Sequence, residues 1–303
     1  MTTTLLDDKA LTALGQHRPL RTGLITARDI RKYCVAVDNR DPLHLDTDIA
    51  RANGFADVVA PPLFPAVATR PVPFEEDLQP DGQYGDLAPP GLGHLQSLLA
   101  GQEWEFIRPA IAGERVIEDI RIGNVEERQG KNGPLVFVLE ESLLSTEDGE
   151  PILRGRNQLV LREPVKDAGP SAAPVASHNS GGPLTSWNGD AMTKRPSLVS
   201  LFMFGATIWA THRIHWDGDS AQAEGLPAPI LPGWMMASYL AEFAQVHAPA
   251  GARLSALSLR YKAFGYPGDA LTCHLSGQTG SVTDLALSNQ AGQTVMAGTA
   301  RFG

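Results

Sequence analysis

Cysteine, strong charge and long apolar runs are all scarce in this sequence of 303 residues. The two cysteines, Cys34 and Cys273, are too few for a disulfide framework or a thiolate metal site, so we interpret both as small buried apolar residues. No apolar run approaches the ~18 residues of a membrane span. The N-terminus also lacks the basic start and apolar stretch of a secretory signal. These absences predict a cytoplasmic protein without a membrane partner.

Basic residues are outnumbered, because the formal net charge is -9. Nonspecific nucleic-acid binding requires a basic face, so the sequence predicts no nucleic-acid partner. A few local Lys or Arg residues would still suffice for a small anionic ligand. The apolar content of 43% and the charged content of 19% are those of a globular protein, and the length predicts two domains or one duplicated domain.

A repeated segment is the main positive signal. From His44 the chain reads HLDTDIARANGF and from His215 it reads HWDGDSAQAEGL, so His, Asp, Asp, Ala, Ala and Gly recur at matching offsets. Further along, Pro62 stands where Gly233 stands in the second copy. The copies are about 170 residues apart, too long a period for a solenoid, so we expect a duplicated unit that presents one His in each half.

Both copies predict the same order of helices. A helix that begins near Thr26 should end at the Asp- and Pro-rich residues before His44, and a helix capped by Ser197 should end near the second copy of that segment. Each His then precedes a short helix, over 47–53 in the first copy and 219–224 in the second.

After these short helices the sequences of the two halves differ, and strands are then predicted in both halves. Residues 58–90 predict an irregular Pro-rich loop, whereas a long apolar helix begins at Gly233. Strands separated by glycine turns come next, which indicates an antiparallel sheet packed on helices, an α+β unit. Predicted strands of the first half cover 103–107, 116–125, 135–145 and 152–161. The predicted organisation is an N-terminal unit over 1–163, a linker rich in Pro, Gly and Ser over 164–194, and a C-terminal unit over 195–303.

The residues around the two histidines resemble the MaoC-like, or R-specific hydratase 2, hydratases and dehydratases of acyl thioesters. The segment Asp38-Asn-Arg-Asp-Pro-Leu-His44 resembles the family element Gly-Asp-x-Asn-Pro-Leu-His. The segments His212-Arg-Ile-His215-Trp-Asp217 and Glu224-Gly-Leu-Pro resemble the His-x-Ile-His-Tyr-Asp and Glu-Gly-Tyr-Pro elements of two-hotdog members. Those members include mesaconyl-C4-CoA hydratases and type 2 hydroxyacyl-thioester dehydratases.

This resemblance implies an α+β double hotdog, in which each tandem unit wraps an antiparallel sheet around a central helix, and a homodimer. It also implies a hydratase or dehydratase of enoyl or 3-hydroxyacyl thioesters, carried by CoA or an acyl carrier protein, without a cofactor. His215 would be the principal acid–base group, with His44 as its counterpart in the first copy. The N–H of Gly233 or Trp234, at a helix N-terminus, would stabilise the thioester oxygen.

Neither copy keeps the family pattern whole. In the first copy, Asn39 occupies the position of the family's catalytic Asp, and the nearby acid is Asp41. In the second copy, Ala210 occupies that position and Trp209 precedes it. An alanine can neither orient a water molecule nor accept its proton. The missing group could come from His212 or from first-half residues at the interface between the halves, or the chemistry could have changed.

Changed chemistry leaves two other functions open. Ala210 and Trp209 could form a drier apolar cavity, suited to isomerisation or cyclisation of a conjugated natural-product substrate with His215 as a hydrogen-bond donor. The chain could instead be a non-catalytic acyl-binding subunit. No metal site is predicted, because the His-x-x-His spacing of His212 and His215 has no third ligand in register.

Several of these residues also have purely structural interpretations. His212 and His215 could close a helix C-terminus, where the helix dipole favours a cation. Asp46 and Asp217 could act as bases, but they fit better as N-caps of the short helices. Trp234 could line an acyl tunnel or belong to the core.

Overall fold

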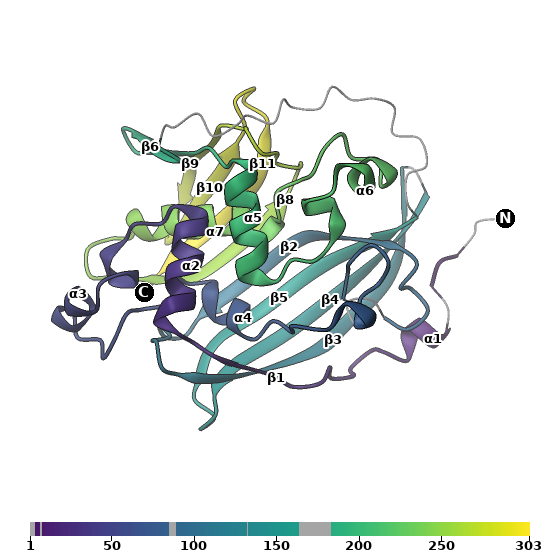
Figure 1. The fold of residues 1–303 in the computed structure, drawn as a ribbon, viewed down its shortest axis with the longest axis horizontal. Coiled ribbons are helices and arrows are strands. Elements are labelled where there is room, and N and C mark those ends of the chain that lie inside the picture. The colour runs from purple at the N-terminus through teal and green to yellow at the C-terminus, as the bar shows by residue number, and fades with distance from the viewer. Residues whose placement is uncertain (1–3, 7, 85–88, 132, 164–182) are drawn as a thin grey trace.

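The chain is described here by a computed structural model that covers residues 4–6, 8–84, 89–131, 133–163 and 183–303. Eleven strands form one antiparallel sheet in the order β1-β3-β4-β5-β2-β8-β11-β10-β9-β7-β6 (Figure 1). The first half contributes β1 to β5 and the second half β6 to β11. The strands are β1 (Arg21–Leu24), β2 (Gln96–Phe106), β3 (Arg115–Gly130), β4 (Gly133–Thr146), β5 (Pro151–Arg162), β6 (Thr185–Asn188), β7 (Ala191–Lys194), β8 (Leu254–Tyr261), β9 (Leu271–Thr279), β10 (Val282–Ser288) and β11 (Thr294–Phe302).

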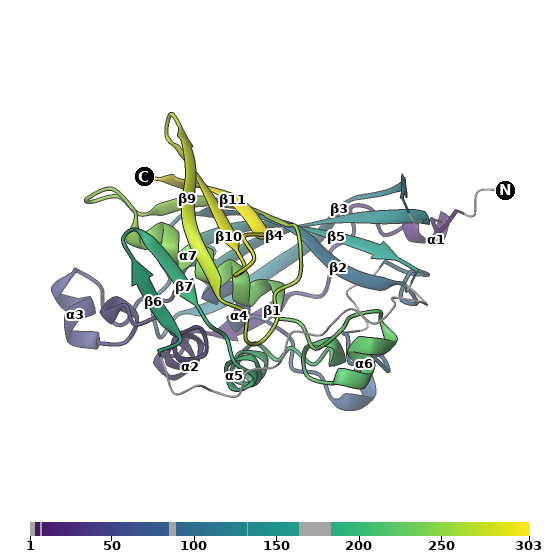
Figure 2. The same ribbon diagram turned by 90° about the horizontal axis from the view of Figure 1, so that it is seen from above.

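Helices α2, α4, α5, α6 and α7 gather on one face of this sheet (Figure 2). None of the helices in the described ranges is both long and apolar enough to cross a membrane. The helices are α1 (Asp8–Leu11), α2 (Ala27–Val37), α3 (Thr47–Ala52), α4 (Phe64–Ala68), α5 (Leu198–Ile208), α6 (Gly218–Ala223) and α7 (Gly233–Val246), with the 3-10 turns η1 (Pro42–His44), η2 (Glu75–Asp77) and η3 (Arg213–His215).

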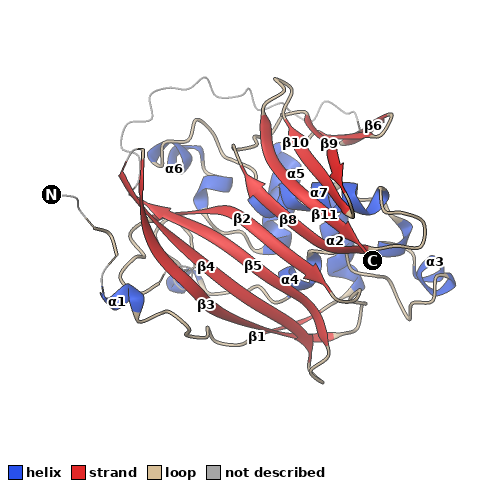
Figure 3. Ribbon diagram, turned by 180° about the vertical axis from the view of Figure 1, so that it is seen from behind, coloured by secondary structure: helices blue, strands red, loops and turns tan. Residues whose placement is uncertain are grey.

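Strands β2 and β8 join the two halves into one continuous sheet (Figure 3). They pair antiparallel, with register from Gly101 opposite Arg260 to Glu105 opposite Ala256. Because β2 and β8 hold equivalent places in their halves, the duplicated units meet edge to edge. The arrangement is the α+β double hotdog that the sequence predicts.

Alternation along the strands places the core on the helix side of the sheet. In β4, Val136, Val138 and Leu144 are buried at every second position, as a half-buried strand requires. The same inward row also carries Glu140, which is only 7% exposed. Both cysteines are fully buried, which confirms their interpretation as core residues.

Equivalent capping residues begin and end the first helix of each half. The Thr26 hydroxyl caps α2 and the Ser197 hydroxyl caps α5, each by accepting a hydrogen bond from a first-turn N–H. Each helix is terminated by a residue in the left-handed conformation, Asp38 at φ 51° and Trp209 at φ 52°. These two positions correspond in the repeat, so the duplication extends to the backbone angles.

The short helices after the two histidines also form as predicted. The Asp46 carboxylate accepts hydrogen bonds from the first-turn N–H groups of α3, and the Asp217 carboxylate does the same for α6. Gly54 and Gly225 follow these helices with positive φ, which residues other than glycine rarely adopt. The interpretation of both aspartates as caps is therefore confirmed.

The central helices of the two halves differ greatly in length. Helix α7 has 14 residues and is buried along most of its length, whereas α4 has five. Pro71 and Pro73 follow α4, and a proline both lacks an N–H and disfavours helical backbone in the residue before it. The segment that the sequence analysis expected to be an irregular loop therefore contains one short helix instead of a second α7.

A hairpin lies where the sequence analysis placed the end of the linker. Residues 185–194 form β6 and β7, and β7 pairs with β9 at the edge of the second half. Asn188 pairs with Ala191, so Gly189 and Asp190 form the two-residue turn, and Gly189 supplies the positive φ of 58° at its first position. Strand β7 precedes α5 as β1 precedes α2, so it belongs to the repeated unit. The other linker residues, 164–182, lie outside the described residues.

Candidate active site

The two histidines sit in equivalent 3-10 turns just after α2 and α5. The Nδ1 atom of His44 lies 2.7 Å from the carbonyl oxygen of Val59, and that of His215 lies 2.9 Å from the carbonyl oxygen of Ile230. A carbonyl only accepts, so each ring donates from Nδ1. The lone pair of the neutral ring is then on Nε2.

The surroundings of His215 keep its ring neutral. Removal from water lowers its pKa to about 4, the hydrogen bond to Ile230 opposes this shift, and the charges of His212 and Arg70 add to it. At neutral pH the ring of His215 is thus a proton acceptor at Nε2. Burial also lowers the pKa of His44, against the attraction of Asp41.

His215 lines a cavity of about 460 Å³ between the two halves, here called the interface cavity. The second half contributes its 3-10 turn, the start of α7 and the end of β8, and the first half contributes the segment after α4 and the inner face of β2 to β5. Polar or charged residues in the lining are Arg21, Arg70, Gln83, Tyr84, Ser97, Glu118, Glu140, Asn157, Thr211, His212, His215, Tyr261 and Lys262.

His212 borders the same cavity, but its ring is already engaged. Its Nε2 lies 3.1 Å from Oε1 of Glu224, and its ring centroid is 5.9 Å from that of His215. Oε2 of Glu224 accepts a hydrogen bond of 2.7 Å from Gln96. Burial raises the pKa of Glu224, but the hydrogen bonds from His212 and Gln96 outweigh it, so the pKa is lowered.

Glu224 and Asp81 supply the ligands that the sequence spacing lacked for a metal site at His212. One ligand atom of each of the three residues lies within 4.8 Å of the others. Their present contacts are mutual ones, however, with His212 hydrogen-bonded to Glu224 and 3.7 Å from Asp81. We interpret the group as a charged hydrogen-bond network that orients His212.

The N-terminus of α7 opens onto the interface cavity. Gly233 and Trp234 both line it, and the first backbone hydrogen bond of the helix is donated by Met235 to Pro232, at 2.9 Å. Within the described residues the two preceding N–H groups have no acceptor, as is normal for a helix start. A Cβ on Gly233 would lie 2.9 Å from the ring of Tyr261, so no larger side chain fits there.

Ala210 and Trp209 have different positions relative to the cavity. Ala210 lines it and presents a methyl group to the cavity. The side chain of Trp209 is 42% exposed and lies outside the lining. Its carbonyl accepts a hydrogen bond from the hydroxyl of Tyr84. Trp209 therefore shapes the site through its backbone.

The first copy of the site is closed. His44 is 2% exposed, and its Nε2 has no hydrogen-bond partner among the described residues; the carboxylate of Asp41 lies 4.0 Å away. Asn39 is 6% exposed and accepts a hydrogen bond from the Asp41 N–H. A neighbouring hollow of about 470 Å³ is lined by Asn39, Asp41 and Glu242 but not by His44.

A buried ion pair holds α7 against the first copy. Lys194 on β7 is 1% exposed and donates to the carbonyl oxygens of Val37 and Asp38, each at 3.0 Å. It also lies 2.8 Å from the carboxylate of Glu242 on α7. Burial raises the pKa of Glu242 to about 7, although Lys194 pulls it down. These contacts tie the end of α2, β7 and α7 together beside the first copy.

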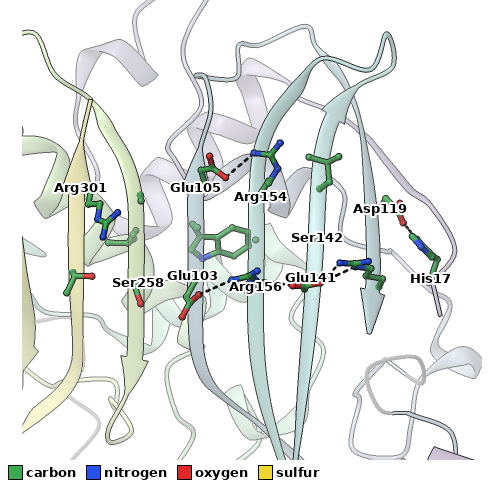
Figure 4. A pocket seen from close by; sticks show the side chains of 17 residues that line it. His17, Glu103, Glu105, Asp119, Glu141, Ser142, Arg154, Arg156, Ser258 and Arg301 are labelled. Atoms are coloured by element: carbon green, nitrogen blue, oxygen red, sulfur yellow. Dashed lines mark hydrogen bonds and ion pairs between the residues drawn. The ribbon is translucent and has the colours of Figure 1, made fainter. Parts of the chain in front are cut away.

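A larger depression of about 770 Å³ lies on the outer face of the sheet (Figure 4). Neither His44 nor His215 lines it. Most of its charged side chains pair with one another: Arg154 with Glu105, Arg156 with Glu103 and Glu141, Arg121 with Glu141, and His17 with Asp119. Exposed pairs of this kind are typical of a solvated sheet face. We therefore place the candidate site in the interface cavity.

Sequence reasoning singled out five of the residues that line the interface cavity: Ala210, His212, His215, Gly233 and Trp234. It missed Arg70, Gln83 and Tyr84, because they follow α4 in a segment with no periodic pattern that would have indicated their orientation. All three belong to the first half, which is one of the two sources expected for the missing polar group.

Comparisons with known proteins agree with this architecture. Residues 13–154 match a family model described as FAS1-like, dehydratase domain region. The mesaconyl-C(4)-CoA hydratase of Chloroflexus aurantiacus is 30% identical over 203 residues, which cover 63% of this chain and 66% of the hydratase. A protein of the UPF0336 group from Saccharopolyspora erythraea is 28% identical over 155 residues, 51% of this chain and 92% of that protein.

Solved structures extend the likeness to the whole chain. A MaoC-like dehydratase from Phytophthora capsici aligns over 99% of this chain and 98% of its own, with a TM-score of 0.71 and 14% identity. A Mycobacterium tuberculosis protein described as having a double hotdog fold aligns over 96% of both chains, with a TM-score of 0.62 and 15% identity. The double-hotdog fold is confirmed, and the chain belongs to the MaoC-like hotdog superfamily.

Proposed function

We propose that this protein is a hydro-lyase that adds water to an enoyl thioester, or removes it from a 3-hydroxyacyl thioester, carried by CoA or an acyl carrier protein. The observation that carries the proposal is the placement of His215, whose Nδ1 donates to Ile230 and whose Nε2 has no hydrogen bond among the described residues, beside the interface cavity that also receives the N-terminus of α7. The similarity to a mesaconyl-C(4)-CoA hydratase supports the same reaction class.

The proposed chemistry needs one base and one oxyanion donor. Nε2 of His215 takes a proton from water as its oxygen bonds to the β-carbon, and the resulting imidazolium delivers that proton to the α-carbon. Negative charge passes through the thioester oxygen in between. The free N–H groups of Gly233 and Trp234, with the dipole of α7 behind them, stabilise that oxygen.

The first half supplies the polar partner that Ala210 does not. Gln83 and Tyr84 line the interface cavity with His215 and also contact the second half, Gln83 through His212 and Tyr84 through the carbonyl of Trp209, while the Nε2 of His212 is bonded to Glu224. This favours a site pooled between the halves over one completed by His212 alone. His44, Asn39 and Asp41 act as structural residues in this proposal.

Isomerisation or cyclisation of a conjugated substrate is the second candidate. It is supported by Ala210, whose methyl group lines the cavity where the family has a polar side chain. In that reaction His215 would bind the substrate without activating water. A non-catalytic acyl-binding subunit would use the same cavity.

The test is the loss of enoyl absorbance when the purified protein meets a panel of enoyl-CoA esters that includes crotonyl-CoA and mesaconyl-C4-CoA. His215→Gln should lower kcat/KM by about 100-fold or more, the usual contribution of a general acid–base group. His44→Gln is the matched control, because His44 makes the equivalent Nδ1 hydrogen bond in the other half, and it should keep its activity. If no ester is consumed, the hydro-lyase proposal is wrong, and binding of an ester without turnover would support the acyl-binding subunit.

A further inference from the structure

The first-half wall of the interface cavity carries charged side chains where an alkyl chain would need apolar ones. Glu118 on β3 and Glu140 on β4 point inward and are 5% and 7% exposed. Arg21 on β1 and Arg70 after α4 line the same cavity. Burial of charged groups is costly unless they are paired. A wall of this kind is poorly suited to an alkyl chain.

The two carboxylates have partners within the protein. The Thr69 hydroxyl donates a 2.6 Å hydrogen bond to Glu118, and Nε of Arg18 donates a 3.0 Å bond to Glu140. Burial raises the pKa of Glu118, against the hydrogen bond from Thr69 and the charge of Arg21. Neither carboxylate therefore needs a ligand to satisfy it.

Arg70 differs from these groups. Its Nε is buried and has no hydrogen-bond acceptor, and it forms no ion pair, within the part of the chain that the structure describes. The guanidinium carbon lies 5.5 Å from the ring centroid of Tyr84, a cation–π contact that fixes its position. A buried N–H without an acceptor is costly, so a ligand that supplies one gains affinity.

Arg70 is also close to the reacting end of the cavity. It lines the same cavity as His215, and it packs on Tyr84, whose hydroxyl bonds to the carbonyl of Trp209 in the segment that leads to His215. A ligand group that reaches Arg70 from His215 belongs to the acyl part of the substrate. The phosphates of CoA are separated from the thioester by the whole pantetheine arm, so they do not fit this position.

We propose that Arg70 is a specificity-determining residue that binds a free carboxylate on the acyl group, so that the preferred substrates are short monothioesters of dicarboxylic acids. This inference rests on the proposed hydro-lyase function. The planar guanidinium presents its donors in a fork that matches a carboxylate. Glu118 and Glu140 line the remaining wall and disfavour a long alkyl chain.

The experiment compares fumaryl-CoA with crotonyl-CoA, which share the carrier and the double bond and differ by a carboxylate in place of a methyl group. The wild-type protein should prefer fumaryl-CoA in kcat/KM. In Arg70→Gln that preference should fall by about 100-fold, because a charge-assisted bidentate contact is lost. Arg70→Lys keeps the charge without the fork and should fall in between. Arg156→Gln removes an equal charge from the outer face of the sheet and should keep the wild-type preference.

The outcomes separate this inference from the proposed function. A wild-type preference for crotonyl-CoA, or an unchanged preference in Arg70→Gln, would overturn the role of Arg70 and leave the hydro-lyase intact. If neither ester is consumed, the hydro-lyase proposal fails, and calorimetric binding of succinyl-CoA and butyryl-CoA decides the role of Arg70 separately. Tighter binding of succinyl-CoA that is lost in Arg70→Gln supports it, and equal binding refutes it.

Discussion

The Lys194–Glu242 pair offers the sharpest test of the claim that the first copy is structural. In Lys194→Met the carbonyl oxygens of Val37 and Asp38 lose their buried donor, and the carboxylate of Glu242 loses its partner. Removal of one member of a buried ion pair typically costs about 3–5 kcal/mol. The free energy of unfolding, measured by urea denaturation, should fall by about that amount at pH 8.

The pH dependence makes this prediction specific to Glu242. Its pKa in the folded protein is raised from 4.5 to about 7 by burial, so the protein takes up a proton there on folding. The associated stability is fully present below pH 4.5 and is lost as the pH rises through 7. Without Lys194 the carboxylate is still harder to ionise, so the loss continues to higher pH. The Lys194→Met penalty should therefore be smaller at pH 5 than at pH 8, because Glu242 is protonated at pH 5 and only the two carbonyl contacts of Lys194 are missing.

Two controls complete the test. Lys194→Met/Glu242→Gln removes both charges and should recover part of the stability at pH 8. The kcat/KM of the folded Lys194→Met protein should match wild type, because the pair is next to the first copy and His215 is in the other site. Equal penalties at pH 5 and pH 8 would refute the pairing, and a large loss of kcat/KM would refute the assignment of the first copy to structure.

The geometry supports three further predictions. Because the pKa of His215 is lowered to about 4, kcat/KM should be flat from pH 8 to pH 5 and should fall tenfold per pH unit below 4. The measurement is made where circular dichroism shows a folded protein. A fall in kcat/KM already at pH 6.5 would contradict a neutral His215 ring. In Gly233→Ala the new Cβ meets the ring of Tyr261 at 2.9 Å, so the start of α7 must shift and kcat/KM should fall by about tenfold or more, with little change in melting temperature. Asp46→Ala removes the cap of α3 and should cost about 1 kcal/mol in unfolding free energy, while Asp46→Asn, which still caps, should cost much less.

The local features of the fold were readable from the sequence. Caps such as Thr26, Ser197, Asp46 and Asp217 are set by hydrogen bonds within a few residues, so the residue types at those places were sufficient to predict them. The repeat also located His44 and His215, and the family resemblance supplied the double hotdog.

The asymmetry between the halves was not readable in the same way. The matching histidines gave no sign that one copy is closed by α7 while the other borders a cavity, because that depends on contacts between distant segments. Arg70 and Tyr84 lie in a Pro-rich stretch whose conformation is set by tertiary packing and not by periodicity. The Thr185–Lys194 hairpin falls within the predicted linker, because its short strands follow a Gly- and Ser-rich segment and their own composition is similar to that of a linker. The catalytic role of His215 stays a prediction until its variants are assayed.

The difference in length between α4 and α7 has a consequence for how such a duplicated protein can diverge. Residues of α4 and of the segment after it line the cavity of the second copy, and Glu242 of α7 lies beside the first copy. The short helix α4 therefore leaves room for the interface cavity, while the long helix α7 supports the common core. Selection on acyl size can then act on one small segment, ended by Pro71 and Pro73, without a cost in stability from the half that carries α7. Exchanging that segment between related proteins should therefore change the acyl groups that the interface cavity binds.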